Sequence, residues 1–364
     1  MKKTKLMKLA LATAGIVAVL SGCGTGGTDS SNSSSSSSSK ASSSEVSPVA
    51  LITDGNGVDD RSFNQSAWEG MVAWGEENGV EQGANGYQYF QSSGESDFIP
   101  NIDQALTAGY QTIFGIGFKL QAAIQEQATA NPDVNFVIVD EVVDGLDNTV
   151  SATFKSNESA YLAGLAAAYS TQTNTVGFLG GMQISLIEAF EAGFKQGVED
   201  GAKALGKDIK VISQYAGDFS APDKGRTIAS AIYAQGADII YGAAGATGNG
   251  LFQEAKSLNE TRDDKVWVIG VDRDQSEEGA YKKDGKEDNF TLTSTLKEVG
   301  EAVKDLAEKS NNGEFPGGEH IVYGLEENGV GLTDGQLSDD AKAAVKEARE
   351  KIIAGDIVVK DTLK

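Results

Sequence analysis

Short apolar runs alternate along the chain with longer segments in which apolar residues recur every three or four positions. The run Val49-Ala-Leu-Ile-Thr53 is typical of a parallel strand covered on both faces. The segment 66–77 carries Trp68, Met71 and Trp74 at helical spacing. Strands are predicted at 49–53, 87–90, 112–114, 136–139, 150–154, 176–179, 211–215, 238–241, 266–271, 292–295 and 321–323. Helices are predicted at 66–77, 98–108, 120–130, 159–169, 184–198, 222–233, 249–258, 296–310 and 339–354.

The order of these segments determines the predicted fold class. Strands that alternate with helices indicate an α/β protein with doubly wound parallel sheets and right-handed crossovers. Because the predicted units are too many for one sheet, we expect two similar lobes. The chain is expected to cross between them near 148–156, 272–276 and 312–332. The N-terminal lobe then comprises 48–153 and 273–312, and the C-terminal lobe comprises 154–272 and 313–364.

The first residues have the pattern of an export signal. A lysine-rich start precedes the apolar stretch 9–20, which is shorter than the roughly 20 residues that span a bilayer. The stretch ends in Leu20-Ser-Gly-Cys23, which resembles the bacterial lipobox and implies removal of residues 1–22 and acylation of Cys23, for example with palmitate. The Ser-rich remainder of 23–47 is then a flexible tether. The alternative is an ordinary secretory signal with an incidental cysteine.

Composition narrows the possible functions. The net charge of −23 argues against a nucleic-acid partner, because phosphate binding needs a basic surface. The single cysteine excludes an internal disulfide framework and a Cys-rich zinc site. The single histidine, His320, argues against a His-based triad and is expected to be structural. We therefore expect neither a metal nor a cofactor.

Polar residues directly follow several predicted strands. In open α/β sheets, ligands bind outside the carboxyl ends of the strands. Asp54, Asp140 and Asp272 occupy such positions, where a carboxylate can cap the next helix, remain solvated or accept hydrogen bonds from ligand hydroxyls. Three carboxylates at facing strand ends favour a shared cleft. The other strand-end positions are Phe118, Gly180-Gly181 and 245–250.

Two aromatic residues accompany these carboxylates. Phe63 follows Asp54 in a polar loop, where an exposed ring can stack on a planar ligand. The alternative is that Phe63 packs on the following helix. Tyr241, at the end of another predicted strand, offers a second ring. The glycine-rich turn 242–250 lacks the sequence of a phosphate-binding loop and suits close approach of a neutral ligand.

Together these segments resemble the basic membrane protein family of substrate-binding lipoproteins, the purine nucleoside receptors of ABC transporters. The matching stretches, within about 48–300, are Asp54 to Asn64, Phe136 to Asp140, Tyr161-Leu-Ala-Gly164, Val176 to Met182, Phe190-Glu-Ala-Gly-Phe194, Asp238 to Gly250, Gly270-Val-Asp272 and Thr293-Ser-Thr-Leu-Lys297. The resemblance implies a type I periplasmic-binding-protein fold, in which two doubly wound lobes, joined by three hinge crossings, close on a nucleoside.

The resemblance also implies which residues contact the base. Phe63 is similar to the ring that stacks on the base, and Tyr241 stands where the family often has Phe. Asp54 and Asp140 resemble the residues that read the edge of the base, and Asn64 is also expected among the ligand-binding residues.

For the sugar, the resemblance implies that Asp272 and Lys297 contact the ribose hydroxyls and that Gly245 makes a backbone contact. Taken alone, Lys297 is typical of a surface lysine. Hydrogen bonds between hydroxyls and a carboxylate contribute roughly 1.5–3 kcal/mol each. Lys297 could orient the Asp272 carboxylate as well as donate to the sugar.

These observations predict a monomeric lipoprotein on the extracytoplasmic face of a bacterial membrane. It would bind guanosine, inosine or adenosine and deliver it to an ABC permease with its ATPase, without being an enzyme. One alternative is the same fold with a sugar or another neutral ligand. A more distant alternative is a nucleoside hydrolase, in which Asp54, Asp59 and Asp60 would bind Ca²⁺ and activate water.

Overall fold

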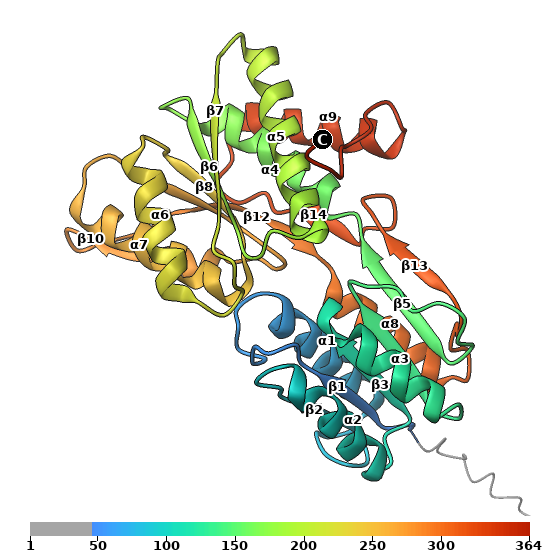
Figure 1. The fold of residues 1–364 in the computed structure, drawn as a ribbon. Coiled ribbons are helices and arrows are strands. Elements are labelled where there is room, and N and C mark those ends of the chain that lie inside the picture. Colours follow the sequence, from blue (N-terminus) through green and yellow to red (C-terminus); the bar gives the residue numbers. More distant parts are fainter. Residues whose placement is uncertain (1–45) are drawn as a thin grey trace, which may run out of the picture. The chain divides into compact units, whose positions relative to one another are not determined.

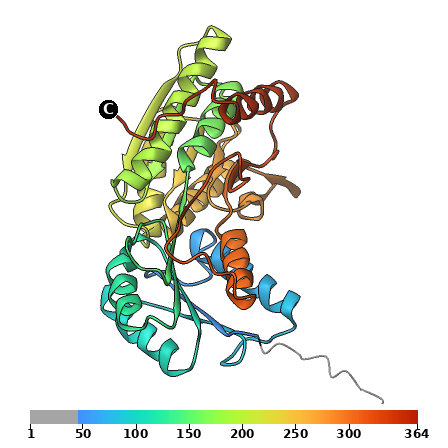
Figure 2. The same cartoon turned by 90° about the vertical axis from the view of Figure 1, so that its right-hand side faces the viewer.

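The computed structural model describes residues 46–364. The expected signal peptide, Cys23 and nearly all of the expected tether lie outside the described residues. Within 46–364, no helix combines the length and apolar character needed to cross a membrane. The described elements form two α/β lobes, whose arrangement is visible in Figures 1 and 2.

The first lobe is built on a parallel sheet with the strand order β13-β5-β4-β3-β1-β2. Its strands are β1 (Val49–Ile52), β2 (Tyr87–Phe90), β3 (Thr112–Ile116), β4 (Asn135–Val139), β5 (Thr149–Phe154) and β13 (His320–Tyr323). Its helices are α1 (Phe63–Asn78), α2 (Phe98–Thr107), α3 (Gln121–Ala130) and α8 (Val299–Asn311). In β1, Val49 and Leu51 pack with α1 and α8, whereas Ala50 and Ile52 pack with α2 and α3. Both faces are therefore covered, which explains the continuous apolar runs.

The second lobe has a sheet with the order β14-β12-β9-β8-β6-β7, in which only β14 is antiparallel. Its strands are β6 (Thr175–Gly180), β7 (Lys210–Tyr215), β8 (Ile239–Ala243), β9 (Trp267–Gly270), β12 (Thr291–Lys297) and β14 (Val330–Leu332). Its helices are α4 (Ser156–Ser170), α5 (Ser185–Leu205), α6 (Pro222–Ala234), α7 (Gly248–Thr261) and α9 (Asp339–Ile353). Helices α4 and α5 pack closely through glycines, since a Cβ at Gly197 would lie 2.0 Å from the carbonyl oxygen of Tyr161.

The chain crosses between the sheets after β5, after β12 and between β13 and β14. The doubly wound, two-lobed α/β fold predicted from the sequence is confirmed. The predicted crossing near 272–276 is wrong, because β12 pairs with β9 and keeps the chain in the second lobe until Lys297. Likewise β13, expected in the C-terminal lobe, pairs with β5 in the first sheet.

The segment between β9 and β12 explains the error. It contains a hairpin formed by β10 (Ala280–Lys283) and β11 (Lys286–Asn289), which is rich in charge and has no apolar pattern. The pattern located β12 but contained no information about its partner. Pairing of distant strands depends on tertiary contacts, which local periodicity does not report.

Candidate ligand-binding site

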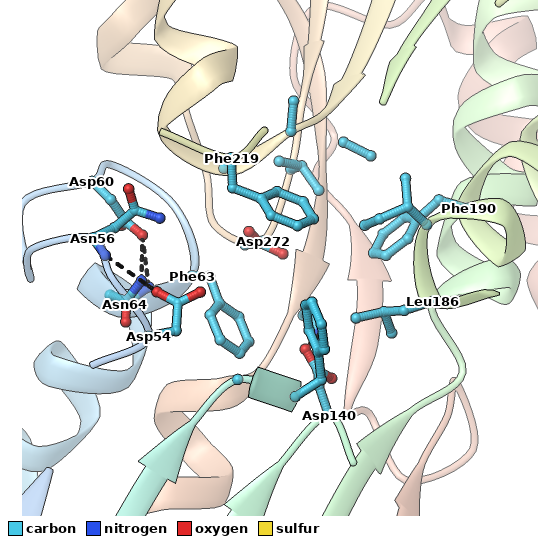
Figure 3. A pocket seen from close by; sticks show the side chains of 18 residues that line it. Asp54, Asn56, Asp60, Phe63, Asn64, Asp140, Leu186, Phe190, Phe219 and Asp272 are labelled. Carbon is cyan, nitrogen blue, oxygen red and sulfur yellow. Dashed lines mark hydrogen bonds and ion pairs between the residues drawn. The ribbon is translucent and has the colours of Figure 1, made fainter. Parts of the chain in front are cut away.

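A cavity that is partly open to solvent lies at the carboxyl ends of strands from both sheets. The first lobe contributes Asp54, Asn56, Asp60, Phe63, Asn64, Gly117, Phe118 and Asp140. The second lobe contributes Leu186, Ile187, Phe190, Phe219, Ala243, Ala244, Gly245, Val271, Asp272 and Lys297. Of the ligand-contact residues predicted from the sequence, all but Tyr241 line this cavity. Figure 3 shows that its side chains converge from two sides.

Asp60 determines where α1 begins. Its buried carboxylate accepts hydrogen bonds from the backbone N–H groups of Asn64 (3.0 Å) and Gln65 (3.1 Å), in the first turn of the helix. These groups have no partner within the helix, so the carboxylate stabilises the N-terminus at Phe63. The helix was predicted to start at 66. Phe63 is therefore the first residue of α1 and not a loop residue, and its ring is partly packed on the core while it also lines the cavity.

Asp54 and Asn64 form a polar pair on the first lobe. The Asn64 amide donates to Asp54 (3.1 Å) and to Asp60 (2.9 Å), as Figure 3 shows. Burial raises the pKa of the Asp54 carboxyl, and the hydrogen bond from Asn64 opposes this shift. The Oδ1 atom of Asn64 is buried and has no hydrogen-bond partner among the described residues. Asn64 and Asp54 can therefore accept hydrogen bonds from ligand N–H groups.

Asp140 and Lys297 form a buried ion pair across the cavity. Each side chain is only 4% exposed, and the pair joins the end of β4 in the first lobe to the end of β12 in the second. The ammonium also lies 4.8 Å from the ring centroid of Phe63. The Oδ1 atom of Asp140 has no partner among the described residues. The expectation that Lys297 orients Asp272 is wrong, because its ammonium bonds to Asp140 instead.

Asp272 is held by a different group. Its carboxylate accepts a hydrogen bond from the Ser62 hydroxyl of the first lobe. Burial raises its pKa to about 6, although the nearby Lys297 charge and the Ser62 bond both lower it. A buried carboxylate with such a pKa is unfavourable in the free protein. Ligand hydroxyls that donate to it would offset that cost.

Tyr241 is not part of the cavity, which corrects the sequence prediction. Its ring is fully buried beside Phe178 and Phe194, and its hydroxyl bonds to the Thr295 hydroxyl at 2.9 Å. Strand β8 continues to Ala243, two residues beyond the predicted end, so residues 243–245 meet the cavity instead. The partner of the Tyr241 hydroxyl, Thr295, is therefore a core residue.

Other aromatic rings line the second-lobe side of the cavity. Phe219 lies in the loop after β7, and Phe190 lies on α5 (Figure 3). Phe219 also approaches Phe118 of the first lobe, with 6.5 Å between ring centroids. Gly181 makes room for Phe219, because a Cβ there would lie 2.3 Å from its ring.

Sequence reasoning missed Phe219 and Phe190 as ring residues. Phe219 carries the signal that identified Phe63, an aromatic side chain in a polar segment after a strand. Phe190 carries no such signal, because it belongs to the apolar face of an amphipathic helix.

The charges of the cavity restrict its ligand. Four carboxylates (Asp54, Asp60, Asp140 and Asp272) line it with one lysine. This environment disfavours anions and suits a neutral molecule that is rich in hydrogen-bond donors. Within 46–364, no group of three His, Cys, Asp or Glu residues could hold a metal ion. Asp60, proposed above as a Ca²⁺ ligand in one alternative, instead caps α1.

Two lobes that close on one polar and aromatic cavity define a substrate-binding protein of the periplasmic-binding-protein type. The family model "ABC transporter substrate-binding protein PnrA-like" (Bmp) matches residues 47–362, and the chain belongs to this family. It is therefore an ABC transporter substrate-binding protein and not an enzyme.

Named relatives extend over most of the chain. The chain is 50% identical to the "ABC transporter nucleoside-binding protein BmpA" of Lactococcus lactis, over 99% of each chain. It is 34% identical to "Basic membrane protein A" of Borreliella burgdorferi, over 86% of this chain and 88% of that protein. A solute-binding protein structure from Aeropyrum pernix has a TM-score of 0.75 at 26% identity, covering 87% of this chain and 94% of the other.

Proposed function

We propose that the protein captures a purine nucleoside, namely guanosine, inosine or adenosine, between its lobes and delivers it to an ABC permease driven by an ATPase. The observation that carries this proposal is one cavity in which phenyl rings from both lobes accompany acidic hydrogen-bond acceptors. A nucleoside combines a flat base, N–H donors and ribose hydroxyls, and it is neutral. The relative that is 50% identical bears the name of a nucleoside-binding protein, which supports the same ligand class.

In this proposal, the base stacks between the lobes. Phe63 supplies one ring, and Phe219 and Phe190 supply the second-lobe rings that the sequence predicted at Tyr241. Stacking of this kind contributes roughly 0.5–1.5 kcal/mol for each ring pair beyond the buried area. Asp54 and its partner Asn64 accept from the N–H groups of the base edge.

The remaining polar residues bind the ribose and the nearby edge of the base. Asp272 accepts from the ribose hydroxyls, and Lys297 donates to them while bonded to Asp140. The free Oδ1 atom of Asp140 accepts from the base edge. Gly245, whose φ of 54° suits glycine, brings the backbone close to the ligand.

We also propose that Cys23 carries the lipid that holds the protein at the extracytoplasmic face of a bacterial membrane, and that the protein acts as a monomer. Mass spectrometry of the membrane-extracted protein tests the lipid, which Cys23→Ser is expected to abolish. Sedimentation velocity tests the monomer.

Isothermal titration of residues 46–364 with guanosine, inosine and adenosine tests the ligand. We expect dissociation constants below about 1 µM, which corresponds to about 8 kcal/mol. Free ribose is the control for a sugar-binding site, and it should not compete with the nucleoside. Absence of heat and of thermal stabilisation with all three nucleosides would reject the proposal. Competition by ribose at a similar concentration would favour the sugar alternative.

A further inference from the structure

The loop between β1 and α1, residues 53–62, belongs to the first lobe but makes several bonds to the second. At one end, Ser220 donates to the side chain of Asn56 at 2.7 Å. In the middle, the Asn249 amide donates to the carbonyl oxygen of Asp60 at 3.3 Å. At the other end, around Arg61, the bonds to the second lobe are most numerous. This loop therefore contacts the second lobe along most of its length.

Arg61 is bonded on two sides. Its carbonyl oxygen accepts a hydrogen bond from the Gln275 amide at 2.8 Å, and its guanidinium forms an ion pair with Glu278. The next residue, Ser62, donates to Asp272. We call Arg61, Ser62, Gln275 and Glu278 the closure clasp. All of these bonds join the two lobes, so they exist only when the lobes are closed.

Gln275 connects the clasp to the ligand cavity. Its side chain is 4% exposed, and its Oε1 atom accepts from the backbone N–H of Val271 at 2.8 Å. Val271 immediately precedes Asp272, which has a φ of 68°. The amide thus holds the turn that orients the Asp272 carboxylate, while its other end reaches Arg61 in the opposite lobe.

The backbone of Arg61 supports the same interpretation. Its φ is 62°, in the left-handed region that non-glycine residues rarely adopt. Such a conformation persists where surrounding contacts hold it. The carbonyl and the guanidinium of Arg61 both bond to the second lobe, whereas the next N–H, that of Ser62, bonds to Asp60 within the first lobe. Opening of the lobes would therefore remove part of the contacts that hold this turn.

We propose that the closure clasp determines how long the lobes stay closed and positions Asp272 without touching the ligand. Arg61, Gln275 and Glu278 do not line the cavity. They are therefore positioning residues, and their removal should act mainly on the dissociation rate. The effect on lobe closure does not depend on which ligand binds, whereas the effect on ligand release rests on the proposed function.

Energy transfer between one dye on each lobe measures closure directly. The full chain with Cys23→Ser leaves no native cysteine, and dyes can be attached through Gln125→Cys on α3 and Gln253→Cys on α7, both of which are exposed. Without ligand, Arg61→Ala and Gln275→Met should each reduce the closed population. Arg61→Lys should retain part of the closed population. The double variant Arg61→Glu with Glu278→Arg, which reverses the ion pair, should have a larger closed population than either Arg61→Glu or Glu278→Arg alone.

Stopped-flow binding of guanosine provides the second readout. We expect dissociation to accelerate about 2–10-fold in Arg61→Ala, with little change in the association rate. Gln275→Met should also weaken binding by about tenfold, since Asp272 loses its support. Glu77→Ala is the matched control, because it removes an exposed ion pair with Lys304 that lies within the first lobe and should change neither readout.

The outcomes separate the two proposals. If Arg61→Ala remains folded but leaves both the closed population and the dissociation rate unchanged, the clasp is rejected. An increase in dissociation with an unchanged closed population also contradicts it, because the effect would then not arise from closure. If the unmodified protein binds no nucleoside, the proposed function fails, and the closed population without ligand still decides whether the clasp exists.

Discussion

Asp140 and Asp272 occupy equivalent positions in the two lobes. Asp140 directly follows β4, and Asp272 lies two residues after β9. Strand β4 is the fourth from the β2 edge of its sheet, and β9 is the fourth from the β7 edge of the other sheet. The φ angles of the two aspartates are 67° and 68°. Both side chains line the same cavity. Asp140 is neutralised by Lys297 from the other lobe, whereas Asp272 receives the uncharged hydroxyl of Ser62. The same backbone turn thus presents two carboxylates of different electrostatic character to one ligand.

Asp272→Asn should stabilise the ligand-free protein at neutral pH and weaken nucleoside binding. Burial raises the pKa of this carboxyl from 3.8 to about 6, so the folded protein holds its proton more tightly than the unfolded chain does. Stability from this group is therefore fully present below pH 4 and decreases as the pH rises to about 6. At pH 7 the cost is about 3 kcal/mol, which the neutral amide avoids.

Calorimetric melting of this variant at pH 4 and pH 7.5 measures the effect. The gain in melting temperature over the unmodified protein should be larger at pH 7.5. Asp263→Asn, at a fully exposed aspartate, is the control and should show no such difference. A lower melting temperature at pH 7.5 than that of the unmodified protein would contradict the interpretation.

Lys297→Met should destabilise the protein, because it leaves the Asp140 carboxylate buried without its counter-charge. Removal of one partner of a buried pair typically costs about 3–5 kcal/mol. Asp140→Asn in the Lys297→Met background should recover much of this loss, since no unpaired charge remains. Urea unfolding at pH 7 measures both. Lys304→Met, at an exposed ion pair, is the control, and equal effects of Lys297→Met and Lys304→Met would refute the prediction.

The sequence predicted most of the site because its acidic residues lie next to the strands that hold them. Asp54, Asp140 and Asp272 follow continuous apolar runs, so a local pattern is enough to place them at the cavity. The same reasoning placed Tyr241 at the cavity incorrectly, because the pattern predicted that β8 ends at residue 241, two residues before its observed end. Within a strand such a shift moves the predicted site from the strand end into the core.

Contacts between the lobes could not be predicted from local patterns. Ser62 and Gln275 are ordinary polar residues in the sequence, and their roles arise from partners more than 200 positions away, Asp272 and Arg61. The lobe assignment of β12 and β13 failed for a related reason, since parallel pairing depends on distant strands. Helix and strand positions are local properties, whereas closure and pairing are properties of the folded chain.

Gly181→Ala should weaken ligand binding without altering the lobes. A Cβ at this position would lie 2.3 Å from the Phe219 ring, which must then move within the cavity. We expect an affinity loss of about tenfold, comparable to the loss of one aromatic contact. Titration calorimetry measures it, with Gly248→Ala as the control, because nothing lies within 4 Å of a Cβ there. In a Phe219→Ala background, Gly181→Ala should have little further effect, and a fully additive loss would contradict the proposed cause.

Tyr241→Phe and Phe219→Leu should separate the core ring from the cavity ring. Tyr241→Phe removes a buried hydrogen bond to Thr295, which should lower stability by about 1 kcal/mol. The Thr295 hydroxyl keeps a hydrogen bond to the carbonyl oxygen of Gly270 at 3.3 Å, so no buried donor is left without a partner. Nucleoside affinity should remain unchanged. Phe219→Leu should show the opposite pattern, with weaker binding and little change in melting temperature. Thermal melting and titration of both variants test whether Tyr241 is a core residue and Phe219 a ligand contact. Loss of affinity in Tyr241→Phe would contradict the placement of Tyr241 outside the binding site.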